Sequence, residues 1–143
     1  MKRNVYGALT MLAVALMISV PMSQAQRRTI ANVPFAFSMN QGSMPAGGYE
    51  ISSERDKVLV VRNLDTKEAR LLIVSMHVEA SQASAPPHAK LVFRKYDDQY
   101  FLAQIWDGES RTGMALPESK REKELQTASN FDHQPELVVI AMK

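Results

Sequence analysis

Residues 90–107 read KLVFRKYDDQYFLAQIWD and contain two runs of strand-forming residues on either side of Asp97-Asp98. The short polar break predicts a two-residue hairpin turn. Directly opposed residues share a face of a sheet, so the turn pairs Phe93 with Leu102, Val92 with Ala103 and Arg94 with Phe101. One face then holds Leu91, Phe93, Tyr100, Leu102 and Trp106, and the other holds Val92, Tyr96, Phe101, Ala103 and Ile105. Because both faces are largely apolar, we expect the hairpin in the interior of a sheet, covered on each side.

The N-terminus has the pattern of a secretory signal peptide. Lys2 and Arg3 precede an uncharged apolar run over residues 5–20, and Ser23-Gln24-Ala25 fits cleavage before Gln26. A membrane anchor is the alternative, but the apolar run is shorter than the roughly 20 residues that a spanning helix needs. We therefore predict a signal peptide over residues 1–25, a mature chain without a membrane span, and a secreted or periplasmic location.

The mature chain is predicted to be a single β domain over residues 26–143. Its 118 residues are the size of one domain. Cleavage of the signal peptide would remove Lys2 and Arg3. The mature chain then has 15 basic and 15 acidic residues and a formal net charge of zero. This balance argues against a nucleic-acid partner. The chain has no cysteine, which excludes disulfides, thiol catalysis and thiolate metal sites.

Short apolar segments separated by turn residues predict the remaining strands. Residues 28–39 are predicted to form the first strand. Pro34 cannot donate a hydrogen bond to a ladder, so this strand is expected to lie at a sheet edge or to be bent. A turn at 40–43 follows. Further strands are expected over residues 49–53, 58–63, 70–78 and 111–116, with an exposed loop at 80–89. The last strand, residues 137–142, is continuously apolar and is expected to be covered on both faces.

One helix is expected in the C-terminal half, from Ser119 to Ser129. Ser119 and Glu122 have the spacing of a capping box, in which the serine accepts from the Glu122 amide and the carboxylate reaches back. About eight short antiparallel strands and one helix define an all-β domain. A small barrel is favoured because closure covers the two-sided hairpin and removes edges. A two-sheet sandwich is the alternative.

Several motifs resemble those of a family of small secreted proteins from Acidobacteria-type soil bacteria. They are VPFAF at 33–37, MPAGGY at 44–49, the hairpin segments LVF at 91–93 and DQYFL at 98–102, and SKRE at 119–122. The family pattern is VPFxF, LPAGxY, KLVFxxYxDQYFL and SKRE, and it spans nearly all of the mature chain. Met44 replaces the family's leucine, and Asp97 replaces its glycine in the turn. The resemblance implies export and one compact domain, and it assigns no catalytic residue.

Three residues are candidates for a metal or catalytic site. His77 and Glu79 project to one side of the same predicted strand, and His88 opens the next. Imidazole and carboxylate groups are ligands for zinc and related metals. The spacing matches no specific metal motif, and the alternative is that all three are exposed residues near strand ends.

A second set of candidates lies on the central hairpin. Arg94 is expected on a face otherwise filled by apolar residues, so its charge must be paired or must reach solvent. In a hollow barrel, Arg94, Tyr96 and Gln99 would orient a small ligand. The alternative places them at the solvent rim near the turn.

The sequence favours a non-enzymatic exported protein, barrel-like in architecture, that binds a small molecule or an envelope protein or has a structural role in the envelope. No cofactor is expected. One alternative is a small barrel enzyme or metal-binding protein that uses His77, Glu79 and His88. Another is an adhesion or protein-interaction sandwich, in which a free edge such as the strand containing Pro34 accepts a partner strand.

Overall fold

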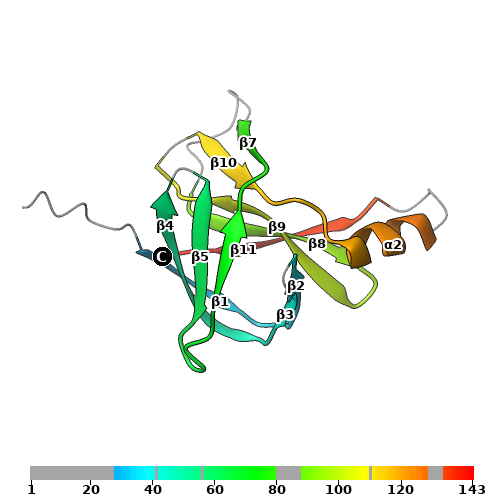
Figure 1. The fold of residues 1–143 in the computed structure, drawn as a ribbon, viewed down its shortest axis with the longest axis horizontal. Helices are drawn as coiled ribbons and strands as arrows, with labels where there is room; N and C mark the ends of the chain where they lie inside the picture. Colours follow the sequence, from blue (N-terminus) through cyan, green and yellow to red (C-terminus); the bar gives the residue numbers. More distant parts are fainter. Residues whose placement is uncertain (1–27, 41, 56, 80–87, 110, 129–133) are drawn as a thin grey trace, which may run out of the picture.

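The computed structural model describes residues 28–40, 42–55, 57–79, 88–109, 111–128 and 134–143. The predicted signal peptide and most of the predicted loop at 80–89 lie outside these residues. The described residues form eleven strands and one helix (Figure 1). These are β1 (Arg28–Val33), β2 (Phe37–Met39), β3 (Gly42–Met44), β4 (Gly47–Arg55), β5 (Val58–Asn63), β6 (Ala69–Ile73), β7 (Met76–Glu79), β8 (Lys90–Tyr96), β9 (Gln99–Trp106), β10 (Thr112–Ala115), α2 (Lys120–Ala128) and β11 (Glu136–Ala141).

The strands form two sheets, which confirms the all-β class with one helix. The four-stranded sheet has the order β1-β4-β5-β6, and all of its pairs are antiparallel. The seven-stranded sheet has the order β11-β8-β9-β10-β7, and β2 joins it by pairing parallel with β9 and antiparallel with β3. Within the described residues no continuous ladder closes the two sheets into a barrel.

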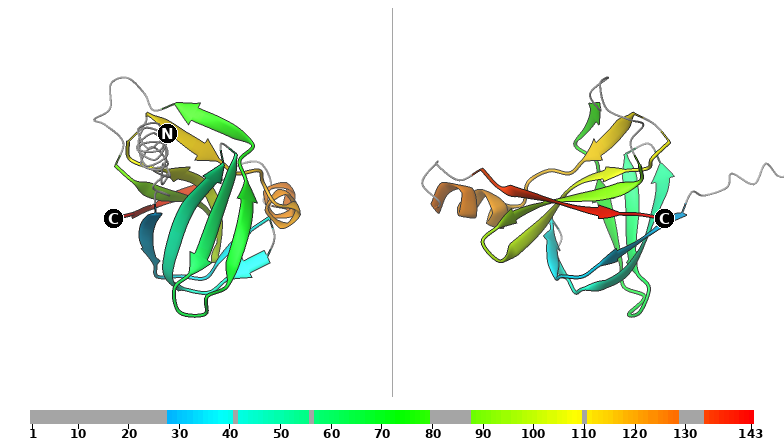
Figure 2. Two further views of the ribbon diagram at one scale, coloured as in Figure 1. Left: turned by 60° about the vertical axis from the view of Figure 1, so that its left-hand side comes forward. Right: turned by 180° about the vertical axis from the view of Figure 1, so that it is seen from behind.

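The two sheets meet at one corner, where β1 approaches the end of β11 (Figure 2). Ala31 and Met142 form an isolated antiparallel bridge. Beside it, the amide of Ile30 donates to the carbonyl of Lys143 at 2.9 Å, and the amide of Lys143 donates back to Ile30 at 2.9 Å. The first and last described strands are therefore tied together. The chain passes from one sheet to the other between β1 and β2, between β3 and β4, and again between β6 and β7.

The β8–β9 hairpin has the predicted two-residue turn. Tyr96 pairs with Gln99 across it, and Asp97 has a φ of 50°, the left-handed conformation that such turns require. The turn therefore has two residues, with aspartate in the positive-φ position. Its strands occupy the interior of the seven-stranded sheet, as expected, because β11 pairs with β8 while β2 and β10 pair with β9.

The register farther from the turn differs from the prediction. Phe93 pairs with Leu102 and Arg94 with Phe101 as expected, but Val92 pairs with Gln104 because the ladder shifts between Val92 and Phe93. A β-bulge inserts one residue into one strand and reverses the faces beyond it. The predicted faces of Ile105 and Trp106 are therefore wrong. Ile105 belongs to the main core, and Trp106 is buried on the opposite side.

Two predicted strands are divided in the structure. Residues 28–39 break at Pro34 into β1 and β2, which lie in different sheets, and β1 is an edge strand of the four-stranded sheet. Residues 70–78 divide into β6 and β7 around Val74 and Ser75, which was not expected. The alternation of apolar residues continues through this segment, but Leu72 and Val74 are buried whereas Met76 is 62% exposed.

The last strand is less covered than predicted. β11 pairs with β8 along its length, and apart from the single bridge at Met142 it forms an edge of the seven-stranded sheet. Val138 and Ile140 face the core, while Leu137 and Val139 are 63% and 55% exposed. The expectation that both faces of this strand are covered is therefore wrong.

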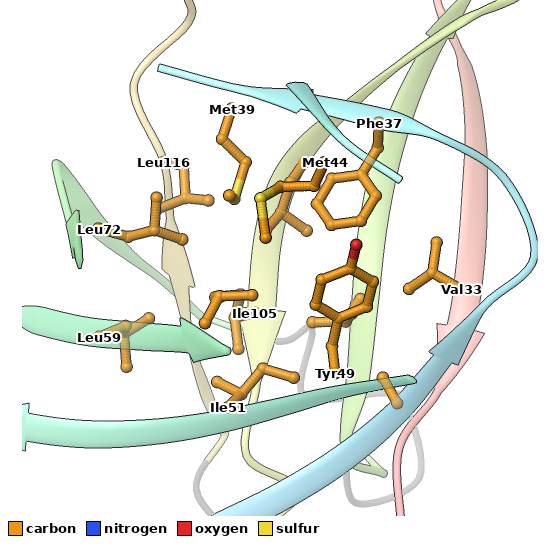
Figure 3. Packing of buried hydrophobic residues seen from close by; sticks show 14 of the residues in the cluster. Val33, Phe37, Met39, Met44, Tyr49, Ile51, Leu59, Leu72, Ile105 and Leu116 are labelled. Atoms are coloured by element: carbon orange, nitrogen blue, oxygen red, sulfur yellow. The ribbon is translucent and has the colours of Figure 1, made fainter. Parts of the chain in front are cut away.

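The core lies between the two sheets and is filled by large side chains (Figure 3). Phe37 contacts both Tyr49 and Phe93 edge to face, with ring centroids 5.1 and 5.3 Å apart. Tyr49 is fully buried, and its hydroxyl donates to the carbonyl of Pro45. Met44 and Leu59 fill the neighbouring space. The region that a hollow barrel would offer to a ligand is therefore occupied by side chains of the protein itself.

Candidate functional site

Arg94 forms an ion pair with a residue of the helix α2. Its guanidinium Nε donates to a carboxylate oxygen of Glu122, from the first turn of α2. The Glu122 side chain is 2% exposed and that of Arg94 is 19% exposed, so the pair is largely removed from water. The Nη2 atom of Arg94 is buried and has no hydrogen-bond partner. Arg94 thus satisfies the predicted need for a partner, and that partner belongs to the protein.

Tyr96 is engaged by the same helix. Its hydroxyl accepts a hydrogen bond from Gln126 Nε2 at 2.7 Å. Burial raises the pKa of Tyr96, and the bond to Gln126 partly offsets this rise. Gln99, the third predicted ligand-binding residue, pairs with Tyr96 beside the turn and is half-buried. Two of the three predicted groups therefore hold α2 against the hairpin.

One of the two hydrogen bonds of the predicted capping box is present at the start of α2. The amide of Glu122 donates to the Ser119 hydroxyl at 3.1 Å, and the helix begins at Lys120. The Glu122 carboxylate was expected to reach back to the amide of Ser119, but it bonds Arg94 instead. Salt-bridge formation with a buried guanidinium has replaced the second half of the capping box.

The predicted metal ligands are not brought together. His77 and Glu79 lie two residues apart on β7, and both are exposed, as is His88 just before β8. Among the described residues no group of three or more histidine, aspartate or glutamate side chains is arranged to hold a metal ion.

A cleft lies along β6, on the side where the two sheets are not joined by a ladder. Its apolar half has a volume of about 350 Å³. The floor of this half is made by core residues from both sheets, and the rim is made by the exposed side of β6 together with Asn40 and Pro117. The floor residues are Met39, Leu72, Leu102 and Leu116, and the rim residues on β6 are Leu71 and Ile73.

Next to it lies a polar half of about 500 Å³, between the β2–β3 hairpin and the start of α2. Met39 and Asn40 line both halves, so the two halves adjoin at these residues. Hydroxyl, amide and charged groups replace the leucines here. The residues that line only this half are Ser38, Gly42, Ser43, Glu118, Ser119, Lys120 and Arg121.

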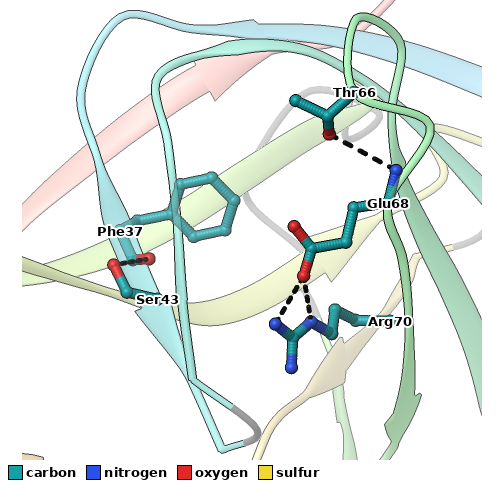
Figure 4. Close-up of polar contacts among 5 residues, drawn as sticks. All are labelled: Phe37, Ser43, Thr66, Glu68 and Arg70. Atoms are coloured by element: carbon teal, nitrogen blue, oxygen red, sulfur yellow. Dashed lines mark hydrogen bonds and ion pairs between the residues drawn. The ribbon is translucent and has the colours of Figure 1, made fainter.

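Both ends of β6 come close to the other sheet, and one of them is hydrogen-bonded to it. At one end Arg70, held by Glu68, points from β6 toward the β2–β3 hairpin (Figure 4), and its Nη1 lies 3.7 Å from the position that a Cβ on Gly42 would occupy. Just past the other end, the Ser75 amide and hydroxyl donate to the carbonyl of Ala115 at 2.9 and 3.0 Å. Leu71, Leu72 and Ile73, which line the apolar half of the cleft, lie between these two points.

Sequence reasoning did not identify this cleft. Its walls come from β2, β6 and the segment between β10 and α2, which are distant in sequence and are joined only by tertiary packing. One signal was present, because Leu71 and Ile73 form an apolar alternation on the side of the strand opposite to Leu72 and Val74. A strand with two apolar faces but only one covered face leaves an exposed apolar surface.

Comparisons with protein-family models, with curated proteins and with solved structures find no match. Among the described residues no helix has the length and apolar character needed to cross a membrane. The family, the export and the location therefore remain predictions.

Proposed function

We propose that the mature chain is an exported, non-enzymatic domain that binds a small molecule in the cleft along β6. The observation that carries this proposal is the floor of the cleft, where Met39, Leu72, Leu102 and Leu116 of the core are reached from the surface. Ligand sites are mostly apolar concavities of about 300–1,000 Å³ with a few polar groups. The volume and the lining of the cleft both agree with that description.

In this proposal the predicted barrel is replaced by an incomplete one. We propose that the two sheets act as an incomplete barrel, joined at the β1–β11 corner and open along β6. Large side chains of the described residues fill the region between the sheets, so a ligand is expected at the open side. In this arrangement Arg94 and Tyr96 have an indirect role, because they hold α2 and thereby one wall of the cleft.

Native mass spectrometry with elemental analysis, on the protein exported from its own kind of bacterial host, tests this function. We expect a stoichiometric small molecule on the wild-type protein. Ile73→Glu places a charge at the rim of the cleft and should remove the extra mass. Val139→Glu is the matched control, since Val139 is similarly exposed on a strand outside the cleft and should leave the extra mass in place.

A wild-type protein of bare mass, or an extra mass that survives Ile73→Glu, would contradict the proposal. A bound metal in its place would support the alternative site at His77, Glu79 and His88.

A second candidate function, protein interaction by strand addition, rests on the backbone of β6. The amide of Val74 donates to the carbonyl of Lys57, the residue just before β5. In the antiparallel register Leu72 pairs with Leu59 two residues away, so Leu72 also points its backbone groups toward β5. Leu71 and Ile73 then direct their amides and carbonyls to the free edge. An extended peptide could pair with these groups. Protection of the Leu71 and Ile73 amides from hydrogen exchange in the presence of a partner protein would favour this candidate.

A further inference from the structure

We propose that the ligand of the cleft is a single-chain amphiphile with an anionic head group, an inference that rests on the proposed function. The two halves of the cleft differ in chemistry and adjoin at Met39 and Asn40, which line both. An apolar chain would lie over Leu72, Leu102 and Leu116, and its head group would lie in the polar half. A wholly apolar ligand would leave the polar half unused, and a small polar ligand would leave the leucines exposed.

The polar half contains hydrogen-bonding groups that the protein does not use itself. Within the described part of the chain, the Ser38 hydroxyl, the Asn40 side-chain amide and the Lys120 ammonium make no hydrogen bond or ion pair. The Ser119 hydroxyl is already occupied, because it accepts from the Glu122 amide. Ser38, Asn40 and Lys120 can all donate a hydrogen bond, which favours a head group rich in acceptors.

The charges in the polar half favour an anion. Lys120 and Arg121 line it against one carboxylate, that of Glu118. Glu118 accepts from Gln126 Nε2 at 3.1 Å, and Arg121 contacts Glu124 at 3.5 Å with both side chains well exposed. Because exposed ion pairs are weak, the pair with Glu124 leaves Arg121 free to contribute to the site. Within the described residues Lys120 makes no hydrogen bond or ion pair.

The apolar half favours a chain in place of a ring system. Its lining consists of aliphatic side chains together with one methionine, one proline and Asn40, and no aromatic side chain is among its described residues. Flexible aliphatic walls contact an alkyl chain along its length, whereas flat ligands gain most from stacking on aromatic rings.

Calorimetric titration of the full mature protein tests this inference. The probes are dodecanoate, dodecyl phosphate, dodecanol and dodecyltrimethylammonium, all below micelle-forming concentrations. The first two carry carboxylate and phosphate head groups, the third is neutral, and the fourth places a cation on the same chain. We expect the two anions to bind more tightly than the alcohol, and the cation to bind most weakly. The order of the two anions distinguishes a carboxylate ligand from a phosphate ligand.

Lys120→Glu gives the decisive variant. It should weaken dodecanoate binding by about tenfold and strengthen dodecyltrimethylammonium binding. Glutamate is favourable in the first turn of a helix, so the variant should fold. Lys123→Glu is the matched control, because Lys123 is an exposed lysine on the same helix outside the cleft. It should leave the affinity for dodecanoate within about twofold of wild type.

Two outcomes would overturn the inference, and they differ in what they say about the proposed function. Equal binding of anionic, neutral and cationic probes, lost in Ile73→Glu, would reject the anionic head group while small-molecule binding in the cleft stands. No binding of any twelve-carbon probe would reject the amphiphile class. If the protein from its host also has a bare mass, the proposed function falls with it.

Discussion

The buried pair between Arg94 and Glu122 is expected to dominate the attachment of α2. Glu122→Gln keeps the shape of the side chain and removes its charge, which leaves the Arg94 guanidinium facing a neutral amide in a site where Glu122 is only 2% exposed. Removing one partner of a buried ion pair typically costs about 3–5 kcal/mol. Arg94 keeps 19% of its side chain exposed, so we expect the lower end of this range, about 3 kcal/mol.

Urea unfolding of the mature protein at pH 7 measures this cost. With a slope of about 1.5 kcal/mol per molar urea, a loss of about 3 kcal/mol lowers the midpoint by about 2 M. Glu124→Gln is the matched control on the same helix. The Glu124 side chain is 68% exposed and its ion pair with Arg121 is weak, so the midpoint should change little.

The double variant Arg94→Met with Glu122→Leu separates two effects of Glu122→Gln. One is the cost of leaving the Arg94 charge without its partner, and the other is the loss of the ion pair itself. The buried Nη2 of Arg94 has no hydrogen-bond partner in the native protein. Hydrogen bonds within the protein therefore offset only part of the cost of removing the guanidinium from water. Replacing both charges by apolar side chains should restore the stability to within about 1 kcal/mol of wild type, or exceed it. A double variant as unstable as Glu122→Gln, or a Glu122→Gln midpoint equal to that of the control, would show that this pair does not hold the helix.

Three further predictions concern packing, capping and pH. Gly113→Ala should lower the free energy of unfolding by about 1–3 kcal/mol, measured by thermal unfolding, because the new Cβ would lie 2.4 Å from Trp106 Cε2. Gly48→Ala is the control and should cost less, because its Cβ would meet only the side chain of Leu64, at 3.3 Å. Ser119→Ala should cost about 1 kcal/mol in urea unfolding, through loss of the cap; an unchanged midpoint would contradict this. Burial raises the pKa of Tyr96 above 10.0, so its contribution to stability is complete below about pH 10 and is lost as the pH rises further. Tyr96→Phe should therefore make the alkaline decline in stability shallower, and an unchanged slope would contradict this assignment.

Local sequence patterns predicted the elements better than their connections. The turn at Asp97-Asp98, the cap at Ser119 and the edge position favoured by Pro34 depend on neighbouring residues, and all three are present. The division of residues 28–39 into two strands at Pro34 was not predicted. The division of residues 70–78 into β6 and β7 was missed. The alternation of apolar residues runs unbroken through that segment, and nothing local marks the point where the chain moves from one sheet to the other.

The candidate site shows the same division between local and long-range information. The sequence indicated that Arg94 needs a partner, because a cation among apolar neighbours is costly to bury. It did not indicate that Glu122, 28 residues later, is that partner. The bulge between Val92 and Phe93 was also hidden, and one inserted residue exchanged the faces of Ile105 and Trp106.

The sequence by itself determined the strand-rich class, the central hairpin and its turn, and the position of the helix, because these follow from periodicity, propensity and capping over a few residues. Only the tertiary structure decided that the core is filled, that β6 is an edge strand, and that an apolar and a polar surface adjoin at Met39 and Asn40. Those features depend on the placement of Met39, Leu72, Leu116 and Lys120, which come from segments far apart in the chain. A pattern within one segment contains no information about which other segment will cover it.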